Sequence, residues 1–232
     1  MNMEKRKLNN WMAENKVQSF SVFVSEDPSL LSEGWRSIEE MNLEMVVFFD
    51  GISFNVFVDM VKEYEDNLWG YDVYYQGLNS LEAWLNSIEG YTLVGYNSAK
   101  AWGVLLKQKY PELDVEHHDL LKIFSDASAE HYGNHARRYD LSNMARHNNV
   151  NLKTILLSSP AIKLIADWRK GLFRNTMRNI ANQSVVIAKV FANINLKGEL
   201  YFRDEATGKR VSVKYSQDRK PDTIEDTTLE EE

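Results

Sequence analysis

Three carboxylates in this sequence follow apolar stretches of chain and could bind divalent cations. Glu26 follows residues 20–24, Asp50 follows residues 45–49, and Asp119 comes after a short segment that ends in two histidines. Hard cations such as Mg²⁺ and Mn²⁺ prefer oxygen anions, and two of them together stabilise the attacking and leaving oxygens of a phosphodiester displacement. Isolated acids of this kind would instead be surface, turn or capping residues.

Basic side chains form a second candidate site, this one for phosphate groups. Arg174 and Arg178 lie one turn apart on a predicted helix and therefore face the same way. Such a stripe could bind the phosphates of a nucleic acid without reading its sequence, although a solvated helix face is an equal alternative. The nucleic-acid-binding candidates are Arg137, Arg138, Arg169, Lys170, Arg174 and Arg178, with Arg146 and His147 as a further basic pair.

Cysteine chemistry and histidine-bound metals are not indicated. The chain has no cysteine, which excludes disulfides, thiolate metal sites and cysteine nucleophiles. His131 and His135 have the spacing that would let two imidazoles share a metal on a helix. Gly133 and Asn134 disfavour that helix, so we expect a solvated loop there.

The composition is that of an ordinary globular protein, with 44% hydrophobic and 26% charged residues in a chain of 232. This length suits one domain with appendages. The first twenty residues carry charges throughout, and no apolar run approaches the roughly 18 residues of a membrane span. We therefore expect a cytoplasmic protein with no membrane partner.

The net charge of −7 is concentrated near the C-terminal end. Residues 216–232 hold seven acidic and two basic side chains. Dense charge and low hydrophobicity predict a disordered acidic tail, which would dock a basic partner, cover the protein's own basic surface or aid solubility. The chain thus divides into a polar lead-in (1–16), one domain (17–215) and the tail (216–232).

Hydrophobic patterning predicts strands first, then alternating strands and helices, then helices. Residues 52–58 fit either a returning hairpin strand or the start of a helix. The predicted strands cover 17–24, 45–49, 71–75, 91–96 and 113–117, and a terminal β-hairpin covers 199–215. The predicted helices cover 80–88, 99–109, 119–125, 140–148, 161–169 and 173–193. This order indicates an α/β fold with a mixed β-sheet flanked by helices and a C-terminal β-hairpin.

Several stretches, taken in order, resemble the DnaQ-like DEDD 3′–5′ exonuclease domains, in particular the subgroup found with DEAD/DEAH helicases. The resemblance covers roughly residues 17–215 and implies a ribonuclease-H-like fold. It rests on Gly34-Trp35, Leu93–Asn97 (LVGYN), Asp119–Ile123 (DLLKI), Tyr139–Ala145 (YDLSNMA), Trp168–Gly171 (WRKG) and the closing segment 198–204 (GELYFRD).

The resemblance also implies four metal-binding carboxylates, and this chain departs from that pattern. The first strand should carry Asp-x-Glu but has Val24 and Glu26, and the second motif has Trp102 in place of its Asp. The final helix has Ile180 and Ser184 where a general base and the last Asp belong. One remaining acid cannot hold two cations, and apolar bulk at Val24 and Trp102 would fill the vacated cleft. We therefore expect a degenerate site that binds no cofactor.

Three functions follow as hypotheses. The first is a catalytically inactive exonuclease relative, a pseudoenzyme that binds single-stranded nucleic acid or a helicase or other partner in DNA replication or repair. The second is an active 3′–5′ exonuclease, dependent on Mg²⁺ or Mn²⁺, whose acids (Glu26, Asp27, Asp50 and Asp119) converge within about 4 Å of a shared cation. The third is a protein-interaction or inhibitor protein with no affinity for nucleic acids.

Overall fold

The computed structural model describes residues 3–26, 41–59, 65–98, 106, 117–132, 140–150, 161–204 and 207–215. The strands are β1 (Val17–Val24), β2 (Leu43–Phe49), β3 (Ser53–Val58), β4 (Asn67–Leu68), β5 (Tyr71–Gln76), β6 (Thr92–Gly95), β7 (His117–Asp119), β8 (Glu199–Arg203) and β9 (Arg210–Lys214). The helices are α1 (Met3–Glu14), η3 (Leu78–Ser80), α2 (Leu81–Ser87), α4 (Leu120–Tyr132), α5 (Leu141–His147), α6 (Ala161–Arg169) and α7 (Phe173–Lys197).

Seven strands form one mixed sheet in the order β4-β5-β3-β2-β1-β6-β7. The central strand β1 pairs antiparallel with β2 and parallel with β6, which in turn pairs parallel with β7. All eight residues of β1 are buried, as expected for a strand that is covered on both faces. The predicted mixed α/β sheet and the C-terminal hairpin are confirmed.

A tight turn at Asp50 settles the ambiguity over residues 52–58. The Asp50 carboxylate accepts hydrogen bonds from the backbone N–H groups of Ile52 and Ser53, both at 2.7 Å. Gly51, between them, has a φ of 95°, which glycine adopts without strain. The chain therefore reverses at this point, and β3 returns antiparallel to β2 as the second strand of a hairpin.

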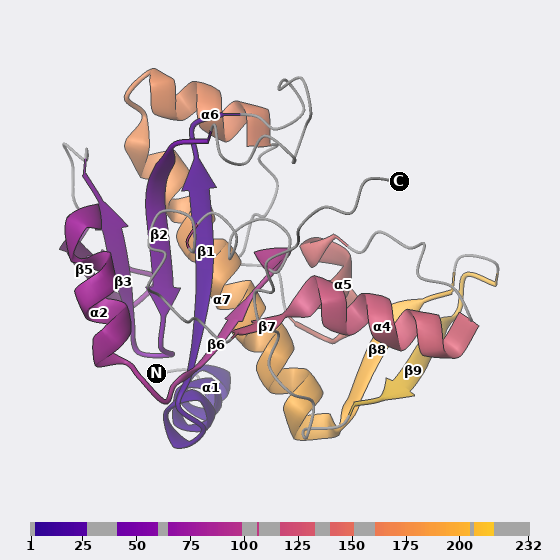
Figure 1. Cartoon of the computed structure of the whole chain (residues 1–232). Coiled ribbons are helices and arrows are strands. Elements are labelled where there is room, and N and C mark those ends of the chain that lie inside the picture. Colours follow the sequence, from indigo (N-terminus) through magenta and orange to yellow (C-terminus); the bar gives the residue numbers. More distant parts are fainter. Residues whose placement is uncertain are drawn as a thin grey trace, which may run out of the picture.

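Alternate residues of the central strands point to opposite faces of the sheet and feed two apolar clusters. On one face, Phe20, Val22 and Val24 of β1 pack with the leucines of η3 and α2. The other face packs against α7 and the remaining helices and holds the larger cluster. In Figure 1, the long helix α7 crosses this face and continues beyond the sheet towards the hairpin β8–β9.

The packing adds to one prediction and corrects another. The predicted lead-in 1–16 contains the helix α1, whose Leu8 and Met12 are buried in the larger core cluster. The helix α4 is longer than expected and continues to Tyr132, so His131 lies on a helix and not in a loop. His135, most of the predicted helix 99–109, most of the predicted strand 113–117 and the tail 216–232 lie outside the described residues.

The hairpin β8–β9 stands apart from the main sheet, beside α4 and α5 (Figure 1). A two-stranded hairpin is at best marginally stable alone. Here Leu200 and Phe202 are buried in the core cluster, and the buried side chain of Asn148 pairs with the backbone of Tyr201. The amide nitrogen of Asn148 donates to the Tyr201 carbonyl at 2.9 Å, and its oxygen accepts from the Tyr201 N–H at 3.0 Å.

Among the described helices, none is both long enough and apolar enough to cross a membrane.

Candidate nucleic-acid interface

The end of β1, where the first acidic motif was expected, is tied to its neighbours. Val24 is buried in the cluster on the α2 side of the sheet. Glu26 accepts hydrogen bonds from the backbone N–H of Asn42 at 2.7 Å and from its side-chain amide at 2.9 Å. Glu26 thus holds the end of β1 to the segment that enters β2, which is a structural role for its carboxylate.

Ile180 and Ser184 lie on the other face of the sheet. The Ser184 hydroxyl donates to the Val47 carbonyl at 3.1 Å, while the Ser19 hydroxyl donates to the Ser184 carbonyl at 2.7 Å. Ile180, also on α7, is buried in the larger core cluster. The family resemblance predicted that these positions line one cleft. Val24 is instead separated from Ile180 and Ser184 by the sheet. Trp102 lies outside the described residues.

Asp27 of the alternative nuclease site lies outside the described residues, and the other three acids of that site do not converge. Phe49, beside Asp50, pairs with Ser19, whereas Leu43 pairs with Val24 at the opposite end of β1. At about 3.3 Å per residue, Asp50 and Glu26 are more than about 15 Å apart. Asp119 caps α4, where its carboxylate accepts the N–H of Leu121 at 2.9 Å. Within the described ranges, no three His, Asp or Glu side chains are grouped to hold a metal ion.

Glu65, which lies just before β4, binds both arginines of the predicted stripe on α7. Glu65 accepts from Arg174 Nε at 2.6 Å and from Arg178 Nε and Nη2 at 2.8 and 2.6 Å. The Glu65 side chain is only 13% exposed. Burial alone would raise the pKa of this carboxyl, but hydrogen bonds and positive charge from Arg178 and Arg174 outweigh it and lower the pKa.

The remaining predicted cations divide between a structural contact and the surface. Arg169, at the end of α6, donates to the Ser25 carbonyl at 2.9 Å and so joins α6 to the end of β1. Lys170 follows it and is exposed. Arg137 and Arg138 lie outside the described residues. Of the six basic residues predicted from the sequence, the four that the structure describes lie on α6, on α7 or between them. Glu65 neutralises part of their charge.

A different basic cluster, which we call the hairpin surface, is formed by Arg146, Arg203 and Arg210. Arg146 is on α5, and the other two are on β8 and β9; all three are exposed. All three contribute positive charge at the partly buried His147. Burial and then the positive charges of Arg146, Arg210 and Arg203 lower the pKa of His147, and Asp140 offsets them in part.

The hairpin surface also carries an aromatic ring. The guanidinium carbon of Arg210 lies 3.9 Å from the centroid of the Tyr201 ring, and the Lys197 ammonium lies 5.9 Å from it. The Tyr201 hydroxyl donates to Glu199 at 2.5 Å, which raises the pKa of Tyr201. Cations and an aromatic ring therefore share one exposed face of the hairpin.

The nearby acids have hydrogen-bond partners of their own. Asp140 caps α5 by accepting the N–H of Asn143 at 2.8 Å. Asp204 accepts from the Tyr132 hydroxyl at 2.7 Å and from the N–H of Thr207 at 2.9 Å, and so fixes the turn between β8 and β9. Their carboxylates hold a helix end and a turn, and the three arginines of the hairpin surface are exposed.

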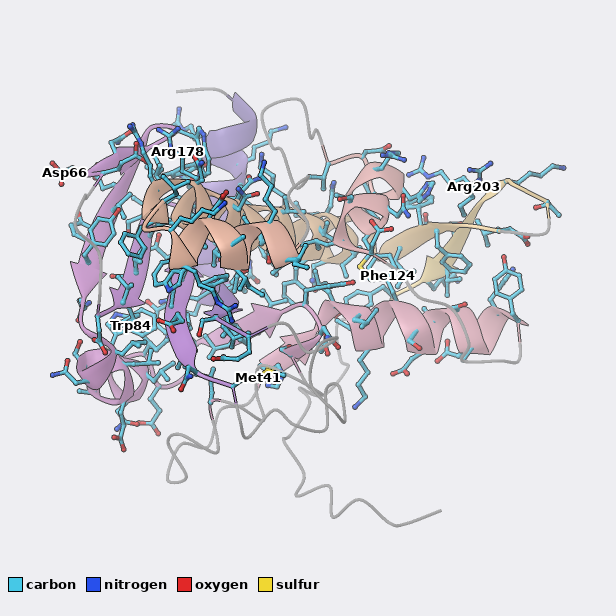
Figure 2. The ribbon with its side chains drawn as sticks, turned by 90° about the horizontal axis from the view of Figure 1, so that it is seen from above. Met41, Asp66, Trp84, Phe124, Arg178 and Arg203 are labelled. Atoms are coloured by element: carbon cyan, nitrogen blue, oxygen red, sulfur yellow. The ribbon has the colours of Figure 1, made fainter. Side chains whose placement is uncertain are left out.

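The two basic clusters occupy different parts of the molecule. Figure 2 labels Arg178 near Asp66 at one end and Arg203 on the hairpin at the other end. Arg146 and His147 were among the basic residues indicated by the sequence, whereas Arg203 and Arg210 were not. The signal was present, because alternation along 210–214 puts Arg210, Ser212 and Lys214 on one face, and a hairpin centred on the predicted turn sets Arg203 opposite Arg210.

Comparisons with known proteins assign no family to this chain. No family model matches it, and no curated protein matches it. A solved structure that matches is described as the yeast NOT1 MIF4G domain co-crystallised with CAF1, at 10% identity over 84% of each chain and a TM-score of 0.44. A likeness of that size carries no argument. The assignment to the DEDD exonucleases is corrected accordingly, because nothing found in the comparisons supports it.

Proposed function

We propose that this protein is a non-catalytic module that binds nucleic acid through the hairpin surface. Its scaffold would be a ribonuclease-H-like sheet, which is supported by the strand order β3-β2-β1-β6-β7 with β2 as the antiparallel member beside β1. Fold alone implies no activity. The proposal therefore depends on the hairpin surface and not on the topology.

The observation that carries this proposal is a like-charge pair. Arg203 and Arg210 are directly opposite each other in the β8–β9 register. Like charges in that position destabilise a hairpin. Arg146 adds a third positive charge beside them. An anionic ligand that bridges these side chains would turn the repulsion into attraction, and a phosphodiester backbone offers regularly spaced anions.

The non-catalytic part of the proposal is supported by the described carboxylates. Glu26, Asp50 and Asp119 each hold a strand end, a turn or a helix start, and they are distributed over different parts of the sheet. Hydrolysis of a phosphodiester by two cations needs carboxylates that converge on a shared ion. Binding needs only the exposed cations.

The test is the binding of a fluorescent oligonucleotide, followed by anisotropy, with cleavage monitored in Mg²⁺ and Mn²⁺. Three phosphate contacts predict a slope of about −2 for log K against log salt concentration. The variant Arg203→Ala with Arg210→Ala should weaken binding by roughly tenfold or more. The matched control is Arg6→Ala with Lys163→Ala, which removes two exposed cations from α1 and α6.

Equal loss of affinity in both double variants would contradict the hairpin surface as the site, because general charge would then explain binding. No binding by the wild-type protein would contradict nucleic acid as the ligand and favour a protein partner. Cleavage that Glu26→Ala abolishes would overturn the non-catalytic part.

A further inference from the structure

The Tyr201 ring and the Arg210 guanidinium form a two-layer stack on the exposed face of the hairpin. The guanidinium lies 3.9 Å above the ring, and Arg210 is exposed. The guanidinium therefore contacts the tyrosine ring at an exposed position of the hairpin. A guanidinium plane held in this way is a surface on which a nucleobase can stack.

This stack is held in place before any ligand arrives. The backbone N–H of Tyr201 donates to the buried Asn148 side chain at 3.0 Å, and the Tyr201 hydroxyl donates to Glu199 at 2.5 Å. Asn148 is itself fixed, because its carbonyl accepts from the Asn193 side chain of α7 at 2.7 Å. A pre-ordered platform loses little conformational entropy when a ligand binds.

Phosphate-binding groups flank the stack. Arg203 lies directly across the strand pair from Arg210, and its Nε donates to the Gly208 carbonyl at 3.2 Å. Lys197 lies 5.9 Å from the centre of the same tyrosine ring. Cations beside a stacking surface match the alternation of bases and phosphates along a single strand.

We propose that the ligand of the hairpin surface is a single-stranded nucleic acid, with one base stacked on Arg210 over Tyr201 and the neighbouring phosphates on Arg203 and Arg146. This inference rests on the proposed function and adds the class of nucleic acid. Bases in a duplex are already stacked and paired, so their faces cannot reach the platform. A single strand presents both features at once.

The decisive experiment uses the unmodified protein with three fluorescent ligands of equal length: a single strand, its duplex and an abasic single strand. The abasic strand keeps the phosphates and lacks the bases. We expect the normal single strand to bind most tightly, with the abasic strand weaker by roughly five- to hundredfold, the range for loss of one stacked base. Because no residue is changed, folding defects cannot produce this result.

Two variants then assign the effect to the platform. Tyr201→Leu should remove most of the preference for the normal strand over the abasic one. Tyr201→Phe keeps the ring, loses only the contact to Glu199, and should retain the preference. Circular dichroism and thermal unfolding check that both variants fold.

The possible failures are distinguishable. If all three ligands bind equally well and with the same salt dependence, the surface binds phosphates alone; the proposed function stands and the base-stacking inference is overturned. If the duplex binds most tightly, the inference is also overturned. If none of the ligands binds, the proposed function itself fails.

Discussion

Arg203 and Arg210 face each other across the two strands of the terminal hairpin, with no opposite charge between them in the strand register. The cross-strand pair at the other end of the hairpin is different, because Glu199 there faces Lys214. One hairpin therefore contains a repulsive pair and an attractive pair. This contrast allows stability and binding to be separated.

Arg203→Glu should stabilise the protein and weaken nucleic-acid binding. An opposite-charge pair with Arg210 replaces the repulsion, and the expected gain is about 0.2–1 kcal/mol, or a rise in Tm of roughly 0.4–4 °C. The matched control is Lys214→Glu, which sets two glutamates opposite each other and should lower Tm by a similar amount. Thermal unfolding and oligonucleotide anisotropy measure both properties. A loss of stability in Arg203→Glu would contradict the like-charge argument.

Glu65→Gln should destabilise the protein at neutral pH without weakening nucleic-acid binding. The Arg178 and Arg174 contacts hold the folded-state pKa of Glu65 below its ordinary value of 4.5. The stabilisation is therefore present above about pH 4.5 and is lost as pH falls through the lower, folded-state pKa. The difference in unfolding free energy between wild type and Glu65→Gln should narrow in acid. Denaturant titrations at several pH values measure this difference.

The contacts of Glu65 also predict the behaviour of the double variant Arg174→Ala with Arg178→Ala. Because Glu65 is the partner of both arginines, this variant should lose stability and keep its oligonucleotide affinity within about twofold. From the sequence alone, phosphate binding by these two residues and a solvated helix face were equal alternatives. A large loss of affinity would restore the α7 stripe as the interface.

Local patterns in the sequence were sufficient for most of the fold but not for the site. Hydrophobic patterning identified the strand 45–49 before Asp50 but left residues 52–58 open between a strand and a helix, and it ended the last helix at residue 193, whereas α7 continues to Lys197. The pairing of Glu65 with α7 could not be foreseen, because 109 residues separate it from Arg174. A charge stripe shows only where cations lie on a helix, whereas its neutralisation depends on a distant segment.

The same limit applies to the hairpin surface. Arg146, Arg203 and Arg210 come from three segments, and the Asn148 side chain joins α5 to β8 through two hydrogen bonds to Tyr201. Alternation alone identified the hairpin, but only the tertiary contact shows which helix lies beside it. The family resemblance placed Val24 and Ser184 in one cleft, whereas the alternation of β1 already assigns Val24 and Ser19, the partner of Ser184, to opposite faces.

Nucleic-acid binding should tighten as pH falls, through His147. In the protein without ligand, burial and the nearby arginines lower the pKa of His147 below its ordinary value of 6.5. Below about pH 6.5 the unfolded chain therefore binds this proton more readily than the folded chain, and stability is lost as pH falls. Phosphates bound to the same arginines would offset their charge and raise the His147 pKa. Proton uptake should then accompany binding.

The measurement is oligonucleotide affinity from about pH 8 to about pH 5.5 in wild type and His147→Gln. The wild-type affinity should rise more steeply, and calorimetry in buffers of different ionisation enthalpy should detect the proton uptake. The charged groups that act on His147 from the surrounding elements are Arg146, Arg203, Arg210 and Asp140. Identical pH profiles for the two proteins would show that His147 does not titrate with the ligand.

Asn148→Ala should detach the hairpin from α5 and weaken both stability and binding. Asn148 is 1% exposed and links Met144, Tyr201 and Asn193 through its side chain and carbonyl. Alanine would leave the Tyr201 backbone N–H and carbonyl without these partners, at a cost of about 1–3 kcal/mol. Hydrogen exchange should accelerate in β8 and β9 before the main sheet. The control is Asn179→Ala, because the Asn179 amide donates to the Asn175 carbonyl one helical turn away on α7. Unchanged exchange in the hairpin of Asn148→Ala would show that burial of Leu200 and Phe202 suffices to hold it, and the platform would then not depend on Asn148.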